Sequence, residues 1–186
     1  MRILVTGAGG QLGRDLVATC AAAGDDVIAA TRADLDVGDA DAVTAAVAAG
    51  RPDVIVNCAA WTAVDACEAD PARAQRDNAL AVRWIRRAAE QVGAHLVQIS
   101  TDYVFAGDLD RPYREDDPTG PRSVYGRSKL DGEREAGPHA TVIRTSWVCG
   151  EHGNNMVRTV LRLLDGHPDR RPDLALGTIV DLRGRS

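Results

Sequence analysis

The chain has 186 residues, of which 45% are hydrophobic and 26% charged, so it is long enough for one well-buried α/β domain but short for a two-domain enzyme. Its formal net charge of -5, without a basic stripe that alternates with aromatic residues, argues against nucleic acid as a partner. No apolar stretch approaches the roughly 18 residues of a membrane span, so we expect a cytoplasmic protein without a membrane partner.

Short apolar runs of strand type recur along the chain and alternate with helical segments. The runs are Arg2–Thr6, Asp26–Ala30, Asp53–Asn57, His95–Ser100 and Thr141–Thr145. This alternation predicts a doubly wound α/β fold, in which helices cover both faces of a parallel sheet. We expect this domain to occupy residues 1–164. Residues 165–186 are rich in Arg, Asp, Pro and Gly, a composition that predicts a divergent, poorly ordered tail.

A glycine-rich turn follows the first run and leads into a helix. Gly7 permits the turn, Gly10 lets the backbone approach a pyrophosphate, and Gly13 allows close packing of helix on strand. The free N–H groups at the start of such a helix bind an anion. This order predicts a Rossmann-type dinucleotide site. The GxxGxxG spacing departs from the simple GxGxxG pattern, and Leu12-Gly13 stands where a P-loop would need Gly-Lys.

The segment Pro71 to Gly93 is predicted to be one helix, because a proline opens its first turn and a glycine ends it. Its apolar stripe consists of Val82, Ile85, Ala89 and Val92. Further along, the polar loop from Gly107 to Pro121 is longer than a typical connection, which favours a functional role.

Tyr125 and Lys129 are one helical turn apart and so lie on the same helix face. The lysine ammonium can lower the pKa of the phenol, which a tyrosine needs to exchange a proton with an alcohol or ketone near neutral pH. Polar or small residues also follow the predicted strands at Asn57, Ser100 and Arg144. Ligands bind at the carboxyl ends of parallel strands, so we expect these clusters to share one rim.

Four motifs resemble the extended short-chain dehydrogenase/reductase superfamily, namely GAGGQLG from Gly7, NCAA from Asn57, STDYVF from Ser100 and YGRSK from Tyr125. Longer stretches resemble the dTDP-4-dehydrorhamnose reductases, namely DVIVNCAAWTAVDACE, QISTDYVFAG, VYGRSKLDGE and IRTSWVCGEHGNNMVRTVLRL. The resemblance is nearly continuous from Met1 to about Leu164. It implies reduction of the 4-keto group of a dTDP-linked 6-deoxy-hexulose to dTDP-L-rhamnose.

The resemblance also implies residue roles. Tyr125 would donate a proton to the ketone oxygen, Lys129 would tune Tyr125 and hold the nicotinamide ribose, and Thr101 would hydrogen-bond the reacting oxygen. The expected substrate residues are Thr62, Val64, Asp102, Tyr103, Trp147 and Asn155. The expected cofactor residues are Gly7, Gly10, Gln11, Leu12, Thr31, Arg32, Asp36, Val37, Ala59, Ala60, Tyr125 and Lys129.

The end of the second predicted strand bears on the choice of cofactor. An acidic side chain there would accept a hydrogen bond from the ribose 2'-hydroxyl of NADH, but this chain has Thr31 and Arg32. A hydroxyl and a guanidinium suit a 2'-phosphate, so we predict a preference for NADPH. Asp34 follows closely, and Asp36 with Val37 resembles the adenine-contacting pair of the superfamily, which keeps NADH use open.

Beyond Leu164 the resemblance stops, where the family continues into a substrate-binding region. We therefore expect a truncated or frame-shifted reductase that keeps the cofactor half and the Tyr/Lys pair, with cofactor binding less affected than turnover. A homodimer is also open. Cys149 and Met156 replace larger side chains of the family, which predicts a looser pocket.

Two other functions remain open at this point. One is an epimerase or dehydratase with tightly held NAD, which the lack of a Glu beside Asp102 disfavours. The other is a non-catalytic subunit that binds dinucleotide, resembling the regulatory subunit of methionine adenosyltransferase. Thr101, Tyr125 and Lys129 favour chemistry over that role.

Cysteine and histidine spacing gives no sign of a metal site. The four cysteines are widely spaced without a CxxC, and the four histidines lack paired ligands at workable distances. We expect the cysteines to be free thiols in a reducing compartment.

Overall fold

The computed structural model describes residues 1–150, 152–153 and 155–165, and the chain divides into two units. The first is Met1–Gly153, and the second begins at residue 154. The described part of the second unit is Asn155 and helix α7, Met156–Asp165. The predicted tail over residues 165–186 lies outside the described residues except for Asp165, which ends α7.

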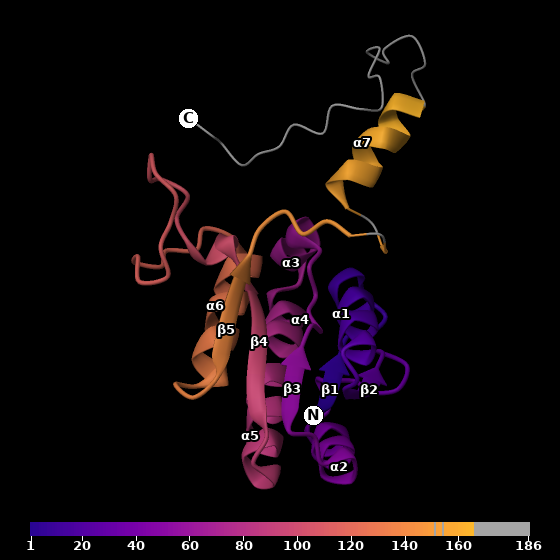
Figure 1. The fold of residues 1–186 in the computed structure, drawn as a ribbon. Coiled ribbons are helices and arrows are strands. Elements are labelled where there is room, and N and C mark those ends of the chain that lie inside the picture. Colours follow the sequence, from indigo (N-terminus) through magenta and orange to yellow (C-terminus); the bar gives the residue numbers. More distant parts are fainter. Residues whose placement is uncertain (151, 154, 166–186) are drawn as a thin grey trace. The chain divides into compact units, whose positions relative to one another are not determined.

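The first unit is built on a parallel sheet of five strands with the order β2-β1-β3-β4-β5 (Figure 1). The strands are β1 Arg2–Thr6, β2 Asp26–Ala30, β3 Val54–Asn57, β4 His95–Thr101 and β5 Thr141–Thr145. All five predicted strands are present, with β3 beginning one residue later and β4 ending one residue later than expected. The Rossmann-type, doubly wound fold predicted from the alternation is therefore confirmed.

Helices cover both faces of this sheet, as the alternation predicted. Helix α1, Gln11–Ala22, packs through Leu16 and Val17 on the face that carries Ile3 and Val5. The opposite face carries Leu4, Ile55 and Leu96. Because side chains alternate along a strand, consecutive residues of β1 pack into the cores on opposite faces of the sheet.

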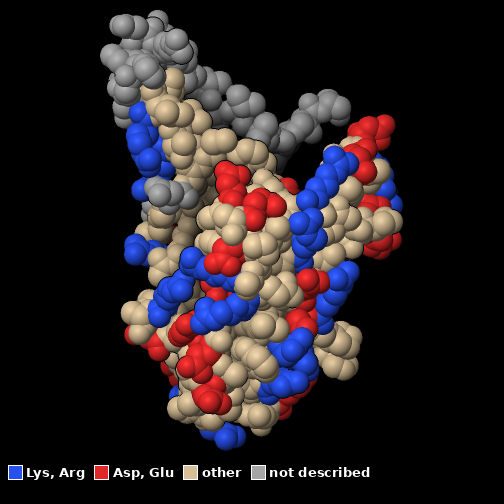
Figure 2. Space-filling model, turned by 180° about the vertical axis from the view of Figure 1, so that it is seen from behind, with Lys and Arg blue, Asp and Glu red and all other residues tan. Residues whose placement is uncertain are grey.

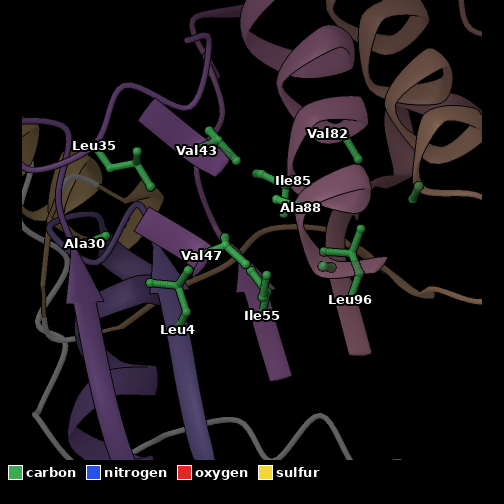
Figure 3. Close-up of a cluster of buried hydrophobic side chains, with 12 residues drawn as sticks. Leu4, Ala30, Leu35, Val43, Val47, Ile55, Val82, Ile85, Ala88 and Leu96 are labelled. Carbon is green, nitrogen blue, oxygen red and sulfur yellow. The ribbon is translucent and has the colours of Figure 1, made fainter. Parts of the chain in front are cut away.

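The larger core lies between that opposite face and two helices. Helix α2, Ala40–Gly50, contributes Val43 and Val47, and α5, Ala81–Val92, contributes Ile85 (Figure 3). All of these side chains are buried. Helix α6, Val124–Ala136, follows on the same side and contacts both α5 and β4.

The predicted helix from Pro71 to Gly93 is continuous but not uniform. It consists of α4 Pro71–Gln75, a π-helical turn η1 Arg76–Leu80, and α5. Its ends are as expected, because Pro71 stands in the first turn and Gly93 ends it with φ 74°. The π-turn is the difference, and such turns add a residue to one turn of helix and change the direction of the side chains around it.

The remaining short elements lie at the carboxyl edge of the sheet. They are α3 Val64–Ala69 and the 3₁₀ turn η2 Asp102–Val104. Between η2 and α6 runs the predicted long loop, which includes the whole of Gly107 to Pro121. Among the described residues, no helix is both long enough and apolar enough to span a bilayer. On the face shown in Figure 2, basic and acidic side chains are interspersed and form no uniformly basic surface.

Candidate functional site

The glycine turn brings the ends of β1 and β3 into close contact. Gly7 has φ +65°, and a Cβ on it would lie 2.7 Å from the backbone nitrogen of Ala59. A Cβ on Gly13 would collide with the carbonyl oxygen of Gly7. Gly10 precedes α1 as its N-cap, and its N–H donates to Gly7 at 2.9 Å. The steric roles expected of Gly7 and Gly13 are therefore confirmed, and the start of α1 faces this turn.

A cleft of about 450 Å³ opens at the carboxyl ends of the strands, among the loops that follow β1, β2 and β3, where the order of the strands reverses. Its lining residues are Gly7, Gly9, Gly10, Thr31, Arg32, Ala33, Leu35, Asp36, Val37, Cys58, Ala59, Ala60, Trp61 and Asp77. Most of the residues predicted to bind a cofactor are in this set. The predicted residues outside it are Gln11, Leu12, Tyr125 and Lys129. The side chain of Gln11 instead donates to the carbonyl oxygen of Val148 at 2.7 Å.

Thr31 and Asp34, in the turn after β2, are hydrogen-bonded to each other. The Thr31 hydroxyl donates to Asp34 at 2.6 Å, and the Thr31 N–H donates to the same carboxylate at 3.0 Å. These bonds lower the pKa of Asp34. Arg32 is exposed at the edge of the cleft. The guanidinium of Arg32, rather than the Thr31 hydroxyl, is therefore the group at this turn that is open to an anion.

Tyr125 and Lys129 are both buried on α6, at 8% and 4% exposure. Burial raises the pKa of Tyr125, and a hydrogen bond between its hydroxyl and Thr101 opposes that rise. Burial lowers the pKa of Lys129 to about 8, against the attraction of Glu133 and Cys58. The expected lowering of the Tyr125 pKa by Lys129 is wrong for this structure, because desolvation dominates the phenol and the ammonium is directed to a backbone carbonyl instead.

That carbonyl belongs to Ile99 in β4, which accepts from the Lys129 ammonium at 2.7 Å and from Gln98 Nε2 at 2.8 Å. Gln98 Oε1 in turn accepts from Asn57 Nδ2 at 2.7 Å, and Asn57 Oδ1 accepts from the Thr6 hydroxyl at 2.6 Å. Thr6, Asn57 and Gln98 are each 1% exposed. A buried chain of hydrogen bonds thus crosses β1, β3 and β4 just beneath the cleft and ends at Lys129.

A second set of polar contacts joins α6 to β5 and β4 through Glu133. Glu133 accepts from Arg144 at 2.9 and 2.7 Å and from the Ser100 hydroxyl at 2.5 Å. The Glu133 side chain is only 9% exposed. Because Glu133 follows Lys129 by four residues, Tyr125, Lys129 and Glu133 form a stripe along one face of α6.

The residues predicted to bind substrate lie in several places on the carboxyl edge of the first unit. Asp102 accepts from the hydroxyls of Thr101 at 3.0 Å and Ser146 at 2.8 Å. The Tyr103 ring meets the Tyr125 ring edge-on, with centroids 5.6 Å apart. Trp147 has φ 54° and is 73% exposed.

Two further predicted residues lie after β3, and one lies in the other unit. Val64 packs against the cluster that contains Tyr125, and Thr62 is exposed on the loop between β3 and α3. Asn155 belongs to the second unit, where its side chain accepts from the backbone N–H of Arg158 at 3.0 Å and caps the start of α7. The substrate roles of all these residues stay predictions.

Several polar residues of the site were not expected from sequence. The Asn78 side chain accepts a hydrogen bond from the Trp61 backbone N–H at 2.8 Å and donates one to the Ser128 hydroxyl at 3.0 Å. These two bonds hold the loop after β3 against α6. Arg76 and Asp77 stand beside Asn78 in η1. Three consecutive polar residues, Arg76 to Asn78, in a helix that packs on the sheet were the available signal, since buried polar side chains need partners. Among the described residues, no group of three His, Cys, Asp or Glu side chains is placed to hold a metal ion.

Comparison with known proteins shows which family this chain belongs to. The family model described as "RmlD substrate binding domain" matches residues 1–171. A dTDP-4-dehydrorhamnose reductase of Streptomyces griseus is 51% identical over 166 residues, which cover 87% of this chain and 55% of that protein. A probable dTDP-4,6-dihydroxy-2-methyloxan-3-one 4-ketoreductase of Streptomyces antibioticus is 50% identical, covering 87% of this chain and 56% of that protein.

Solved structures agree with the sequence comparison. A dTDP-4-dehydrorhamnose reductase of Clostridium acetobutylicum superimposes with a TM-score of 0.87 at 42% identity, over 90% of this chain and 60% of that one. The Bacillus anthracis enzyme in complex with NADP gives 0.84 at 38% identity, over 88% and 60%. The chain thus spans little more than half the length of the curated relatives it matches. The chain belongs to the RmlD substrate binding domain family, as its motifs indicated.

Proposed function

We propose that this chain provides the cofactor site and the proton donor of an NADPH-dependent reductase. Its substrate would be a dTDP-linked 6-deoxy-hexulose, whose 4-keto group becomes the alcohol of dTDP-L-rhamnose. The names of its relatives and the NADP complex of the Bacillus anthracis enzyme support this proposal. The observation that carries it is the position of Trp61, which lines the cleft and packs against the buried cluster that contains Tyr125. The cleft and the Tyr/Lys pair therefore adjoin.

The cleft residues fit a pyridine dinucleotide. Gly7, Gly9 and Gly10 line the cleft without side chains, and the free N–H groups at the start of α1 suit a pyrophosphate. Arg32 would hold the 2'-phosphate, and Asp36 with Val37 would contact the adenine. Gly10, Gln11, Leu12, Ala59 and Ala60 would line the rest of the cofactor. NADH stays open as a weaker cofactor because Asp34 lies at the same turn.

Bound NADPH supplies the hydride that reduces the carbonyl carbon. Tyr125 donates its phenolic proton to the carbonyl oxygen as negative charge develops there. Thr101 lies at the end of β4, where it would orient both the phenol and the reacting oxygen. Lys129 would hold the nicotinamide ribose. Thr62, Val64, Asp102, Tyr103 and Trp147 are proposed to contact the sugar nucleotide.

The proposal is tested by two measurements on the same protein. NADPH binding is followed by the change in nicotinamide fluorescence, and turnover by NADPH consumption with a dTDP-4-keto-6-deoxy-hexulose. We expect Tyr125→Phe to lower kcat by about 10²- to 10⁴-fold while NADPH still binds, because only proton transfer is removed. Tyr113→Phe is the matched control, since Tyr113 stacks on Phe105 and bonds Asp108 away from the cleft.

The outcome that contradicts the proposal is equally specific. A chain that binds neither pyridine nucleotide has no cofactor site of this kind. A chain that binds NADPH but whose turnover is the same in Tyr125→Phe uses another proton donor. We also propose a cytoplasmic location, in keeping with the four free cysteines, and a homodimer, which light scattering would test.

A further inference from the structure

Two carboxylates line the candidate cofactor cleft, and both are paired with one arginine. Asp36 accepts from Arg76 Nη2 at 2.6 Å, and Asp77 accepts from Arg76 Nη1 at 2.6 Å. Arg76 lies directly against Gly38, where a Cβ would collide with the guanidinium. Arg76 itself is not among the lining residues, so it acts on the cleft through its two partners.

The two partners differ in how firmly they are held. The Asp77 side chain is 10% exposed and has a second, longer contact with Arg73 at 3.4 Å. The Asp36 side chain is 47% exposed, and its remaining oxygen accepts from the N–H of Gly38 at 3.0 Å. The pKa of Asp36 is lowered by that backbone bond and by Arg76, with Arg32 adding to the effect. Asp36 therefore stays charged at neutral pH.

The charges of the two cofactors differ at the ribose that this edge would receive. NADPH carries a 2'-phosphate, whereas NADH carries a 2'-hydroxyl that a free carboxylate can accept from. Asp36, which would contact the adenine of the same nucleoside, would repel a nearby 2'-phosphate if it were unpaired, whereas a neutral hydroxyl would not be repelled. Paired with Arg76, the same carboxylate presents little net charge, and Arg32 remains available to the phosphate.

We propose that Arg76 is a specificity-determining residue, which pairs with Asp36 and, together with Arg73, with Asp77 in the wall of the cleft and so favours NADPH over NADH. The inference rests on the proposed cofactor site and adds a residue to it. The π-turn supports the arrangement, because it begins at Arg76 and brings Asp77, Asn78 and Ala79 into buried positions in succession. Asp77 can then line the cleft while Asn78 bonds the loop after β3.

The experiment measures dissociation constants for NADPH and NADH by nicotinamide fluorescence on the full chain. The variants are Arg76→Gln, Arg76→Gln with Asp36→Asn, and Arg83→Gln. Arg83 is the matched control, because it lies in α5, pairs with Glu135 and is absent from the lining of the cleft. We expect Arg76→Gln to weaken NADPH by about 5- to 20-fold and NADH by less than about twofold. Adding Asp36→Asn should restore NADPH binding to within about threefold of the wild type.

Each alternative result has a distinct meaning. If Arg76→Gln weakens both cofactors equally, or no more than Arg83→Gln does, Arg76 has no part in selectivity and the inference fails while the cofactor site stands. Failure of Asp36→Asn to restore NADPH binding also overturns it, since a merely structural arginine would not be rescued by removing its partner's charge. A wild-type chain that binds neither nucleotide overturns the proposed function itself, and this inference with it.

Discussion

The Lys129 ammonium donates a 2.7 Å hydrogen bond to the carbonyl oxygen of Ile99, two residues before Thr101 in the same strand. Gln98 donates to the same oxygen, so the lysine terminates the buried hydrogen-bond chain that begins at Thr6. The strand that leads into the glycine turn and the helix that bears Tyr125 are thereby tied together. The positions of the cofactor turn and the proton donor depend on one another through this chain.

Replacing Lys129 by Met should stabilise the fold. Burial lowers the Lys129 pKa from 10.5 to about 8, so the unfolded chain binds this proton more tightly than the folded one. We expect Met to raise the free energy of unfolding by about 1–3 kcal/mol at pH 7. Gln98 still satisfies the Ile99 carbonyl in the variant.

The pH dependence checks the sign of this effect. The wild type should gain stability as pH rises from about 8 towards 10.5, and the advantage of Lys129→Met should shrink over the same window. Urea unfolding of both proteins at pH 7 and pH 10 measures it. A variant that is less stable than the wild type at pH 7 would show that the ammonium is not penalised by burial.

Replacing Asn57 by Leu should destabilise the fold, because it leaves Thr6 and Gln98 without their partner in a dry part of the sheet. We expect a loss of about 2–4 kcal/mol in urea unfolding. Thr6→Val in the same chain removes one of the stranded groups, so the double variant should lose less than the sum of the two single ones. Strict additivity would mean that the three side chains do not act as a network.

Replacing Gly13 by Ala should be costly, because the new Cβ would collide with the Gly7 carbonyl oxygen and the Cα of Ala8 would be 2.8 Å away. We expect about 1–3 kcal/mol of destabilisation from overpacking. Gly9→Ala in the same turn is the control, since its Cβ would meet only Thr31 at 3.6 Å. Equal stability of the two variants, measured by thermal unfolding, would contradict the packing role of Gly13.

Replacing Glu133 by Gln should both destabilise the fold and change Lys129. The loss of a mostly buried partner strands Arg144, with an expected cost of about 2–4 kcal/mol. Because Glu133 raises the Lys129 pKa, that pKa should fall below its wild-type value of about 8 in the variant, which NMR titration of the side chain would detect. Asp131→Asn removes an exposed partner of Arg134 on the same helix and should cost less than about 0.5 kcal/mol.

Local signals in the sequence were sufficient to predict the strands, the parallel sheet and the glycine turn. Apolar runs located the strands to within a residue at each end, and the order of strands and helices implied a parallel, doubly wound sheet. Gly7 and Gly13 could be interpreted from sequence because their roles depend on backbone conformation and on missing Cβ atoms. The same holds for Pro71 and Gly93 at the ends of the long helical segment.

The partners of the polar side chains were decided by the tertiary structure. Tyr125 and Lys129 share a helix face by spacing alone, yet Lys129 bonds Ile99 thirty residues earlier in the chain. Arg76 finds Asp36 forty residues away, and Asn57 finds Gln98 forty-one residues away. Helix and strand formation depend on neighbouring residues, whereas burial, and with it the pKa of each polar group, depends on which distant elements pack around it.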